Sequence, residues 1–219
     1  MDSRVGVVVL VSGGLDSLLL IQTLWRTRTL VVPVYVRCGL VWEAAELFWL
    51  RRWLAQIRHP RLEALSLLSV PLRSLYANHW SLTGRGTPSR HSPDSAVFLP
   101  GRNILLLSQA AIYAVRRGLS TLAIGTLAGN PFGDATPEFL KRFETCLRQT
   151  LSDSIQITTP LRRWTKAQLI AANQTQPFHL TFSCLQPKGY RHCGRCNKCA
   201  ERQRAFLKAG VPDPTKYAS

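Results

Sequence analysis

The stretch Val5–Ser17 reads V-G-V-V-V-L-V-S-G-G-L-D-S and decides the fold of this chain. Its apolar, β-branched first half predicts a buried strand, and the apolar run Leu18–Ile21 behind it predicts a helix. A tight turn from a strand into a helix points backbone N–H groups at one spot with the helix dipole behind them, so it favours an anion. Gly13 and Gly14 let the backbone approach such a ligand closely. The alternative is a glycine turn with a purely structural role.

The hexapeptide S-G-G-L-D-S lacks the lysine of a phosphate loop and the third glycine of a dinucleotide-binding fingerprint. It resembles instead the PP-loop of ATP pyrophosphatases, which hold ATP and release pyrophosphate while they adenylate a substrate. The resemblance implies that serines and glycines of the loop cradle the β- and γ-phosphates and that Asp16 holds Mg²⁺. The implied ATP-binding residues of the loop are Val11, Ser12, Gly13, Gly14, Leu15, Asp16 and Ser17.

Length and composition indicate a globular protein. The 219 residues suffice for one domain with a core and a small appendage, and 46% of them are hydrophobic while 18% are charged. No apolar run approaches the ~20 residues that cross a bilayer, and residues 5–11 are too few for the core of a signal peptide. We therefore expect a cytoplasmic protein without a membrane segment, in which disulfides are uncommon.

The charge balance favours an anionic partner. The chain has 28 Lys and Arg against 12 Asp and Glu, a formal net charge of +16. Such a charge attracts ATP, a nucleic acid or an acidic protein surface. The basic residues are scattered, and no interleaved aromatics for base stacking are evident. Charge alone does not identify the partner.

Strands and helices alternate along the chain, which predicts an α/β fold with a doubly wound, parallel five-stranded sheet. Strands are expected at 5–11, 30–36, 64–70, 121–125 and 155–158, and helices at 16–25, 42–57, 104–117, 137–150 and 166–173. Thr136 and Thr165 are expected to cap the last two helices. Pro33 lies inside the second strand and indicates an edge position or an early bulge. Residues 71–96 show no such pattern, so we expect an active-site flap or a disordered loop there.

Four of the six cysteines lie close together near the end of the chain. The pattern C-x8-C-x2-C-x2-C suits a structural zinc site, because closely spaced cysteines bring thiolates together around a tetrahedron. Disulfides and an iron–sulfur cluster are the alternatives. Cys38 and Cys146 stand alone and are expected to be buried. The expected division is an ATP-binding domain at 1–180 and a zinc segment at 181–219, with the ligands Cys184, Cys193, Cys196 and Cys199.

Several motifs together carry a more specific resemblance. S-G-G-L-D-S, L-P-G-R-N-I-L-L-L-S, T-P-L-x2-W-T-K-A-Q-L-I and the cysteine segment follow one another in this order. Over essentially the whole chain they resemble the 7-cyano-7-deazaguanine synthase family of queuosine and archaeosine precursor synthesis. The resemblance implies a C–N-bond-forming ligase that uses ATP to adenylate 7-carboxy-7-deazaguanine. Ammonia then gives an amide, and a second ATP converts the amide to the nitrile.

Site residues follow from this resemblance, each with a plainer alternative. Asp16 and Ser12 belong to the expected catalytic set with Lys166, a candidate anion contact that is otherwise a solvated helix lysine. Arg102 and Asn103 are candidates for phosphate or substrate contact, or simply for helix capping.

The chain departs from the family pattern after two strands. Y-G-Q is replaced near Arg37, and the Cys-Arg of Y-P-D-C-R-P-E-F is lost after Asp134. Arg37 and Asp134 are candidate substrate contacts, and the alternative for Asp134 is an ordinary turn aspartate. Glu43, beside the first altered stretch, is a candidate to orient an amine or accept its proton; the alternative is an ordinary acidic residue at a helix N-terminus. Open α/β folds bind ligands at these strand ends, so the departures bear on the second substrate more than on ATP.

Three other functions stay open. The same adenylate can be captured by an amine of a protein or nucleic acid, which the altered strand ends and the charge suggest. A tRNA-modifying PP-loop enzyme is a second option, and a basic zinc-ribbon protein that binds nucleic acid without ATP is a third. The family forms dimers, and a homodimer through the aromatic helix at 42–53 is an option that the sequence does not decide.

Overall fold

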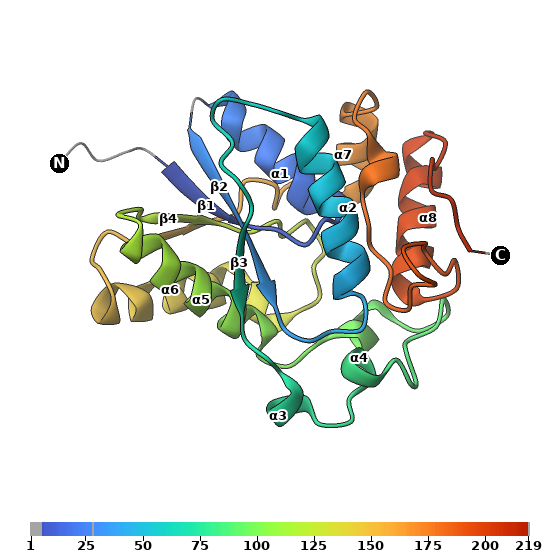
Figure 1. The fold of residues 1–219 in the computed structure, drawn as a ribbon, viewed down its shortest axis with the longest axis horizontal. Helices are drawn as coiled ribbons and strands as arrows, with labels where there is room; N and C mark the ends of the chain where they lie inside the picture. Colours follow the sequence, from blue (N-terminus) through green and yellow to red (C-terminus); the bar gives the residue numbers. More distant parts are fainter. Residues whose placement is uncertain (1–5, 28, 219) are drawn as a thin grey trace.

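The computed structural model describes residues 6–27 and 29–218; Val5, in the first predicted strand, lies outside this part. Five parallel strands form one sheet in the order β3-β2-β1-β4-β5 (Figure 1). The strands are β1 (Gly6–Leu10), β2 (Leu30–Arg37), β3 (Ser66–Ser69), β4 (Thr121–Ala123) and β5 (Gln156–Thr158). The long helices are α1 (Leu15–Arg26), α2 (Glu43–Gln56), α5 (Arg102–Arg116), α6 (Pro137–Thr150), α7 (Lys166–Ala172) and α8 (Asn197–Ala209).

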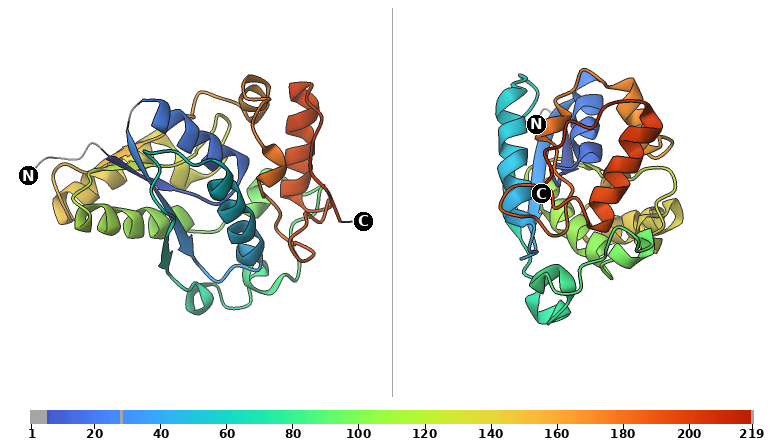
Figure 2. Two further views of the ribbon diagram at one scale, coloured as in Figure 1. Left: turned by 45° about the horizontal axis from the view of Figure 1, so that its top comes forward. Right: turned by 90° about the vertical axis from the view of Figure 1, so that its right-hand side faces the viewer.

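Helices cover both faces of the sheet because successive side chains of a strand point to opposite sides. Val8 and Leu10 of β1 pack in one core with α5 and α6, whereas Val7 and Val9 pack in another with α1 and α2. Figures 1 and 2 show the two helical layers on either side of the strands. The predicted doubly wound α/β fold is confirmed.

Pro33 lies in β2, which is an interior strand, so the expected edge position is wrong. The hydrogen-bond ladder is interrupted beside it instead. Val31 pairs with Leu62, and Val34 pairs with Ser66. Between these two pairs, the segment leading into β3 advances by four residues (62 to 66), whereas β2 advances by only three (31 to 34). This extra residue opens the ladder on the side where proline has no N–H to donate.

Residues 71–96 are not the structureless loop that their composition predicts. They contain α3 (Arg73–Tyr76), α4 (Trp80–Thr83) and most of the 3₁₀ helix η1 (Asp94–Val97), and Ser81 is fully buried. The segment is tied to the cysteine region, since Arg90 N donates to Arg195 O at 2.8 Å and Asn197 N donates to Pro88 O at 3.0 Å. Short helices of this kind depend on tertiary contacts that sequence periodicity does not reveal.

The C-terminal residues join the main core. Phe182, Cys184 and Leu185 belong to the same apolar cluster as β1 and α5, and α8 packs on α7. Arg202 of α8 is 3% exposed and holds the tail, with Nε 3.4 Å from a carboxylate oxygen of Asp213. The division at residue 180 stays a prediction.

Two predicted helix caps and one of two cysteine predictions agree with the structure. Thr136 and Thr165 cap α6 and α7 as predicted, the latter in a capping box with Gln168. Cys38 is buried as expected, but Cys146 is exposed on α6, so that expectation is wrong. Within residues 6–27 and 29–218, no helix combines the length and the apolar character that a membrane crossing requires.

Candidate functional site

A cavity of about 310 Å³ opens at the carboxyl ends of β1, β2 and β4. The β1–α1 turn forms one part of its wall, and the N-terminus of α5 forms another. Lysines of α7 and α8 complete the polar lining. Ten predicted site residues lie in this wall: Val11, Ser12, Gly14, Leu15, Asp16, Ser17, Arg102, Asn103, Asp134 and Lys166.

The β1–α1 turn is held by its own side chains. The Ser17 hydroxyl donates to Gly14 O at 3.1 Å and accepts from Ser12 N at 3.2 Å, and Gly14 N donates to the Ser12 hydroxyl at 3.3 Å. No side chain caps α1 at Gly14, which leaves helix N–H groups directed toward the cavity. The turn therefore suits an anion.

Gly13 supports the turn from behind and is absent from the cavity wall. Its φ of +76° suits glycine, and a Cβ there would lie 3.1 Å from Glu46 O and 3.3 Å from Leu50 Cβ. Its carbonyl accepts from Phe182 N at 2.8 Å, which joins the turn to the C-terminal segment. Gly13 is thus a residue that shapes the turn and connects it to α8.

Asp16 is the acidic residue of the turn, and only part of its carboxylate is satisfied. Oδ2 lies 3.3 Å from Lys166 Nζ, whereas Oδ1 is buried and has no hydrogen-bond partner within the described chain. Lys166 also pairs with Glu201, which in turn lies 2.6 Å from Lys198 Nζ. An unpaired carboxylate oxygen on a cavity wall is the kind of ligand that Mg²⁺ prefers, so Asp16 fits its predicted role.

Burial and charge set the ionisation of this cluster. Burial raises the pKa of Asp16, and the nearby Lys166 only partly offsets this effect. Burial alone would lower the pKa of Lys166, but the carboxylates of Asp16 and Glu201 together raise it above its ordinary value. Burial opposes the ionisation of Glu201, yet Lys166 and Lys198 lower its pKa to about 2. Lys166 is therefore a positively charged side chain that is fixed by ion pairs with Asp16 and Glu201, and it is not a solvated helix lysine.

Arg102 and Asn103 begin α5 at the cavity and differ in their partners. Asn103 N and Nδ2 donate to the carboxylate of Asp134 at 3.3 and 3.1 Å, so Asp134 caps this helix from a distant loop. Arg102 Nε is buried without a hydrogen-bond partner in the described residues. Of these residues, the arginine is the one that the fold leaves free for a ligand.

Besides Gly13, two more residues predicted for the ATP and substrate site lie outside the cavity wall. Glu43 is buried, and its Oε1 accepts from Cys38 N and from Gly39 N, the latter at 2.9 Å. Arg37 lies outward, with Nε 3.9 Å from Glu43 Oε2 and 58% of its side chain exposed. The structure thus places Glu43 as a stabiliser of the turn after β2, and it does not bring Arg37 to the ligand.

Five ionisable residues at this site were not among the predicted site residues: Tyr35, Glu46, Lys198, Glu201 and Arg202. Glu46 and Tyr35 line the cavity, and Glu201 completes the lysine cluster. The signal for Glu46 was its place between Ala45 and Leu47 on a buried helix face, where an acid is unusual. Glu201 lies two residues after the last cysteine of the metal motif, which drew attention away from it.

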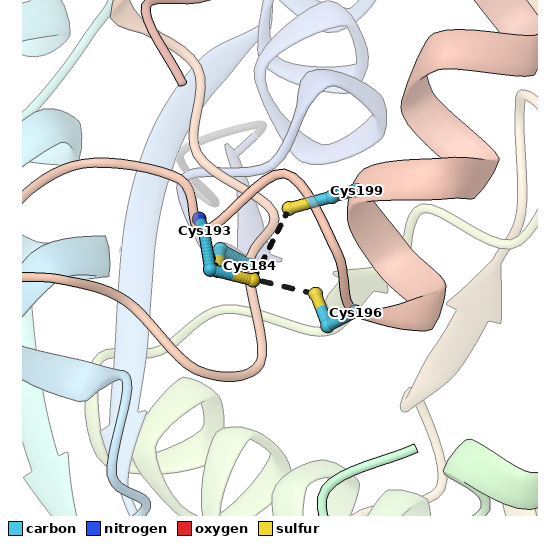
Figure 3. Close-up of side chains that lie close together, drawn as sticks. All are labelled: Cys184, Cys193, Cys196 and Cys199. Atoms are coloured by element: carbon cyan, nitrogen blue, oxygen red, sulfur yellow. Dashed lines mark hydrogen bonds between the residues drawn. The ribbon is translucent and has the colours of Figure 1, made fainter. Parts of the chain in front are cut away.

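The four cysteines form a compact cluster (Figure 3). Their sulfur atoms all lie within 4.8 Å of one another, with Cys193 and Cys199 at 4.0 Å and Cys184 and Cys196 at 3.9 Å. A tetrahedral zinc site with Zn–S bonds of about 2.3 Å requires sulfur separations of about 3.8 Å. Backbone N–H groups of Cys193 and Leu185 also point at two of the sulfurs. The cluster therefore fits zinc binding.

The parallel sheet, the glycine turn at its carboxyl edge and the four-cysteine cluster define an α/β protein of the PP-loop type. The family model described as queuosine biosynthesis protein QueC matches residues 6–210. The chain belongs to this family.

Curated relatives support the membership. Proteins named 7-cyano-7-deazaguanine synthase from Methanothrix thermoacetophila and Syntrophobacter fumaroxidans are 31% and 30% identical to it, over 96% and 99% of this chain and 97% of each relative. One of the same name from Leptospira interrogans is 38% identical over 53% of this chain and 52% of the relative, so that match spans about half of its length.

A solved structure shares the fold. It is described as a predicted subunit of tRNA methyltransferase from Methanocaldococcus jannaschii, with a TM-score of 0.51 at 15% identity over 98% of this chain and 92% of that one. At this identity, the likeness concerns the fold alone.

Proposed function

We propose that this chain converts 7-carboxy-7-deazaguanine and ammonia to 7-cyano-7-deazaguanine with two molecules of ATP. The names of the full-length relatives support the substrate and product. The observation that carries the ATP chemistry is the unpaired Asp16 oxygen beside the uncapped β1–α1 turn on the cavity wall. A triphosphate with its Mg²⁺ satisfies both groups at once.

The first half of the reaction makes the carboxylate reactive. A carboxylate oxygen attacks the α-phosphorus of ATP, its bond to phosphorus forms, and pyrophosphate leaves. The Ser12 hydroxyl and the uncapped N–H groups at the start of α1 bind the departing phosphates, and Lys166 places a fixed positive charge beside Asp16. Asp16 would hold Mg²⁺, which would neutralise negative charge on the leaving group.

The second half forms the C–N bonds. Ammonia attacks the acyl carbon, and AMP leaves with one of the carboxylate oxygens. The nitrogen releases one proton, which gives the amide. The amide oxygen then attacks the α-phosphorus of a second ATP, and pyrophosphate leaves again. Loss of this AMP and of both N–H protons of the amide leaves the nitrile.

Zinc serves structure in this proposal. Cys196 and Cys199 lie at the start of α8, and that helix brings Lys198 to the cavity and Glu201 to Lys166. Phe182, two residues before the first cysteine, binds the glycine turn. Four thiolates leave no open coordination position, so the metal holds these elements and does not bind substrate.

The test is a product assay with the purified protein. Incubation with ATP, Mg²⁺, ammonium and 7-carboxy-7-deazaguanine is expected to give the nitrile and two pyrophosphates per nitrile, measured by mass spectrometry and a coupled phosphate assay. No pyrophosphate above the acid-free control would overturn the proposal.

A second candidate shares the first step and differs in the amine. The loop around Asn130 and Phe132, where the family pattern changes, lines the cavity. If the acid and ATP give pyrophosphate but ammonium gives no amide or nitrile, an amine on a protein or nucleic acid is the acceptor. Mass shifts on candidate acceptors would then identify it.

A further inference from the structure

Two ionisable side chains on the cavity wall, one buried and one half-buried, have no role in the ATP chemistry described above. Glu46 of α2 is 7% exposed, and its Oε2 accepts from the Tyr35 hydroxyl at 2.6 Å. Arg102 of α5 has its Nε buried without a hydrogen-bond partner among the described residues. All three side chains line the cavity, from three different elements.

The acid and the arginine are close enough to influence each other but are not paired. No ion pair within the described part of the chain includes either residue. Burial raises the pKa of Glu46 to about 7, and the charge of Arg102 opposes that rise. Buried charges without partners are costly, so such a pair suits a ligand that offers a donor to one and an acceptor to the other.

Aromatic rings border the same space. Trp42 and Trp80 stack with centroids 5.7 Å apart, and Phe98 and Phe132 stack at 5.4 Å. All four contribute to the cavity wall. Rings of this kind bury a flat heteroaromatic ligand at low entropic cost.

We propose that Glu46 and Arg102 read the pyrimidinone edge of a guanine-type base. That edge presents a carbonyl oxygen, a ring N–H and an exocyclic amino group side by side. The Glu46 carboxylate accepts from the N–H and the amino group, while Arg102 donates to the carbonyl oxygen. Adenine offers an unprotonated ring nitrogen in place of the N–H, so this array separates the substrate base from the base of ATP. The inference rests on the proposed function, because it assigns the deazaguanine ring to this wall.

The experiment compares 7-carboxy-7-deazaguanine with the analogue that lacks its 2-amino group. The wild type is expected to favour the amino compound about 10- to 100-fold in kcat/KM, the range for a hydrogen bond to a charged group. Glu46→Gln keeps an acceptor for Tyr35 but removes one of the two acceptors for the base. Its preference should fall to about 3-fold or less, while the KM for ATP stays within about 2-fold. Glu46→Asp, which retains a carboxylate, should restore much of the preference.

Glu138→Gln, on the exposed first turn of α6, is the matched control and should keep the wild-type preference. Equal losses for both acids in Glu46→Gln would mean that Glu46 only holds Tyr35, and this inference would fail while the proposed function stands. A rise in the KM for ATP alone would place the ATP base at this wall and also overturn it. A wild type that binds neither acid in calorimetry would overturn the proposed function and this inference together.

Discussion

At the scale of single residues, the proposed ATP chemistry depends most on Asp16. One of its carboxylate oxygens is buried without a hydrogen-bond partner in the described residues, and the other lies beside the charged Lys166. Asp16→Asn is expected to reduce acid-dependent AMP formation about 100-fold or more, because the amide binds Mg²⁺ weakly and loses its ion pair with Lys166.

The measurement is single-turnover AMP release, with Asp153→Asn on an exposed turn as the control. AMP release at the wild-type rate from the Asp16 variant would remove the turn from the mechanism.

The buried Glu46 leads to a second prediction, which concerns how the free energy of unfolding depends on pH. Burial raises the folded-state pKa of Glu46 from its ordinary 4.5 to about 7, against the opposing charge of Arg102 and with further repulsion from Glu43. Between these values the folded state binds more protons than the unfolded state, so this group lowers stability as the pH rises. Glu46→Gln should therefore raise the free energy of unfolding at pH 8 by up to about 3 kcal/mol and change it little at pH 4.5.

Urea unfolding at both pH values measures this difference. Equal effects of the substitution at pH 4.5 and pH 8 would show that Glu46 is not buried as an acid.

At the scale of elements, the C-terminal segment holds the active-site turn. Phe182 binds Gly13, and Asn197 donates to Ser92 O at 2.9 Å, so the cysteine region joins both the turn and the 71–96 segment. Removal of the metal should therefore loosen these contacts and weaken ATP binding as well as lower stability.

Chelation of the purified protein is expected to lower Tm by about 10 °C, equivalent to about 3–5 kcal/mol in a domain of this size. Hydrogen exchange should increase at 181–201 and at the β1–α1 turn, and added zinc should reverse both effects. Unchanged exchange at the turn would mean that the metal site and the ATP site are independent.

The elements also show what the sequence can and cannot predict. The strands and long helices followed from apolar periodicity, and Thr136 and Thr165 were found because caps are local. The sequence did not predict the short helices α3 and α4 or the interior position of Pro33, because all three features depend on contacts with distant segments. Asp16 and Lys166 were predicted from local motifs. Glu46 and Glu201 were not predicted, because their partners come from other elements.

At the scale of the whole molecule, the formal net charge of +16 needs a physical explanation. Under the proposed function, it attracts ATP and an acidic substrate and does not define a nucleic-acid site. tRNA should then bind only non-specifically, with affinity that falls at least about 100-fold between 50 and 200 mM salt.

A salt series in fluorescence anisotropy measures this dependence, with nitrile formation followed in parallel. Salt-resistant tRNA binding, or a requirement for tRNA in turnover, would favour the tRNA-modifying alternative.

The central claim is that a carboxylate attacks the α-phosphorus of ATP bound at the β1–α1 turn. The most direct measurement uses 7-carboxy-7-deazaguanine labelled with ¹⁸O in both carboxylate oxygens and mass spectrometry of the AMP formed. Each AMP is expected to carry one ¹⁸O, with two labelled AMP molecules for every nitrile. Unlabelled AMP, or label recovered in pyrophosphate, would contradict it.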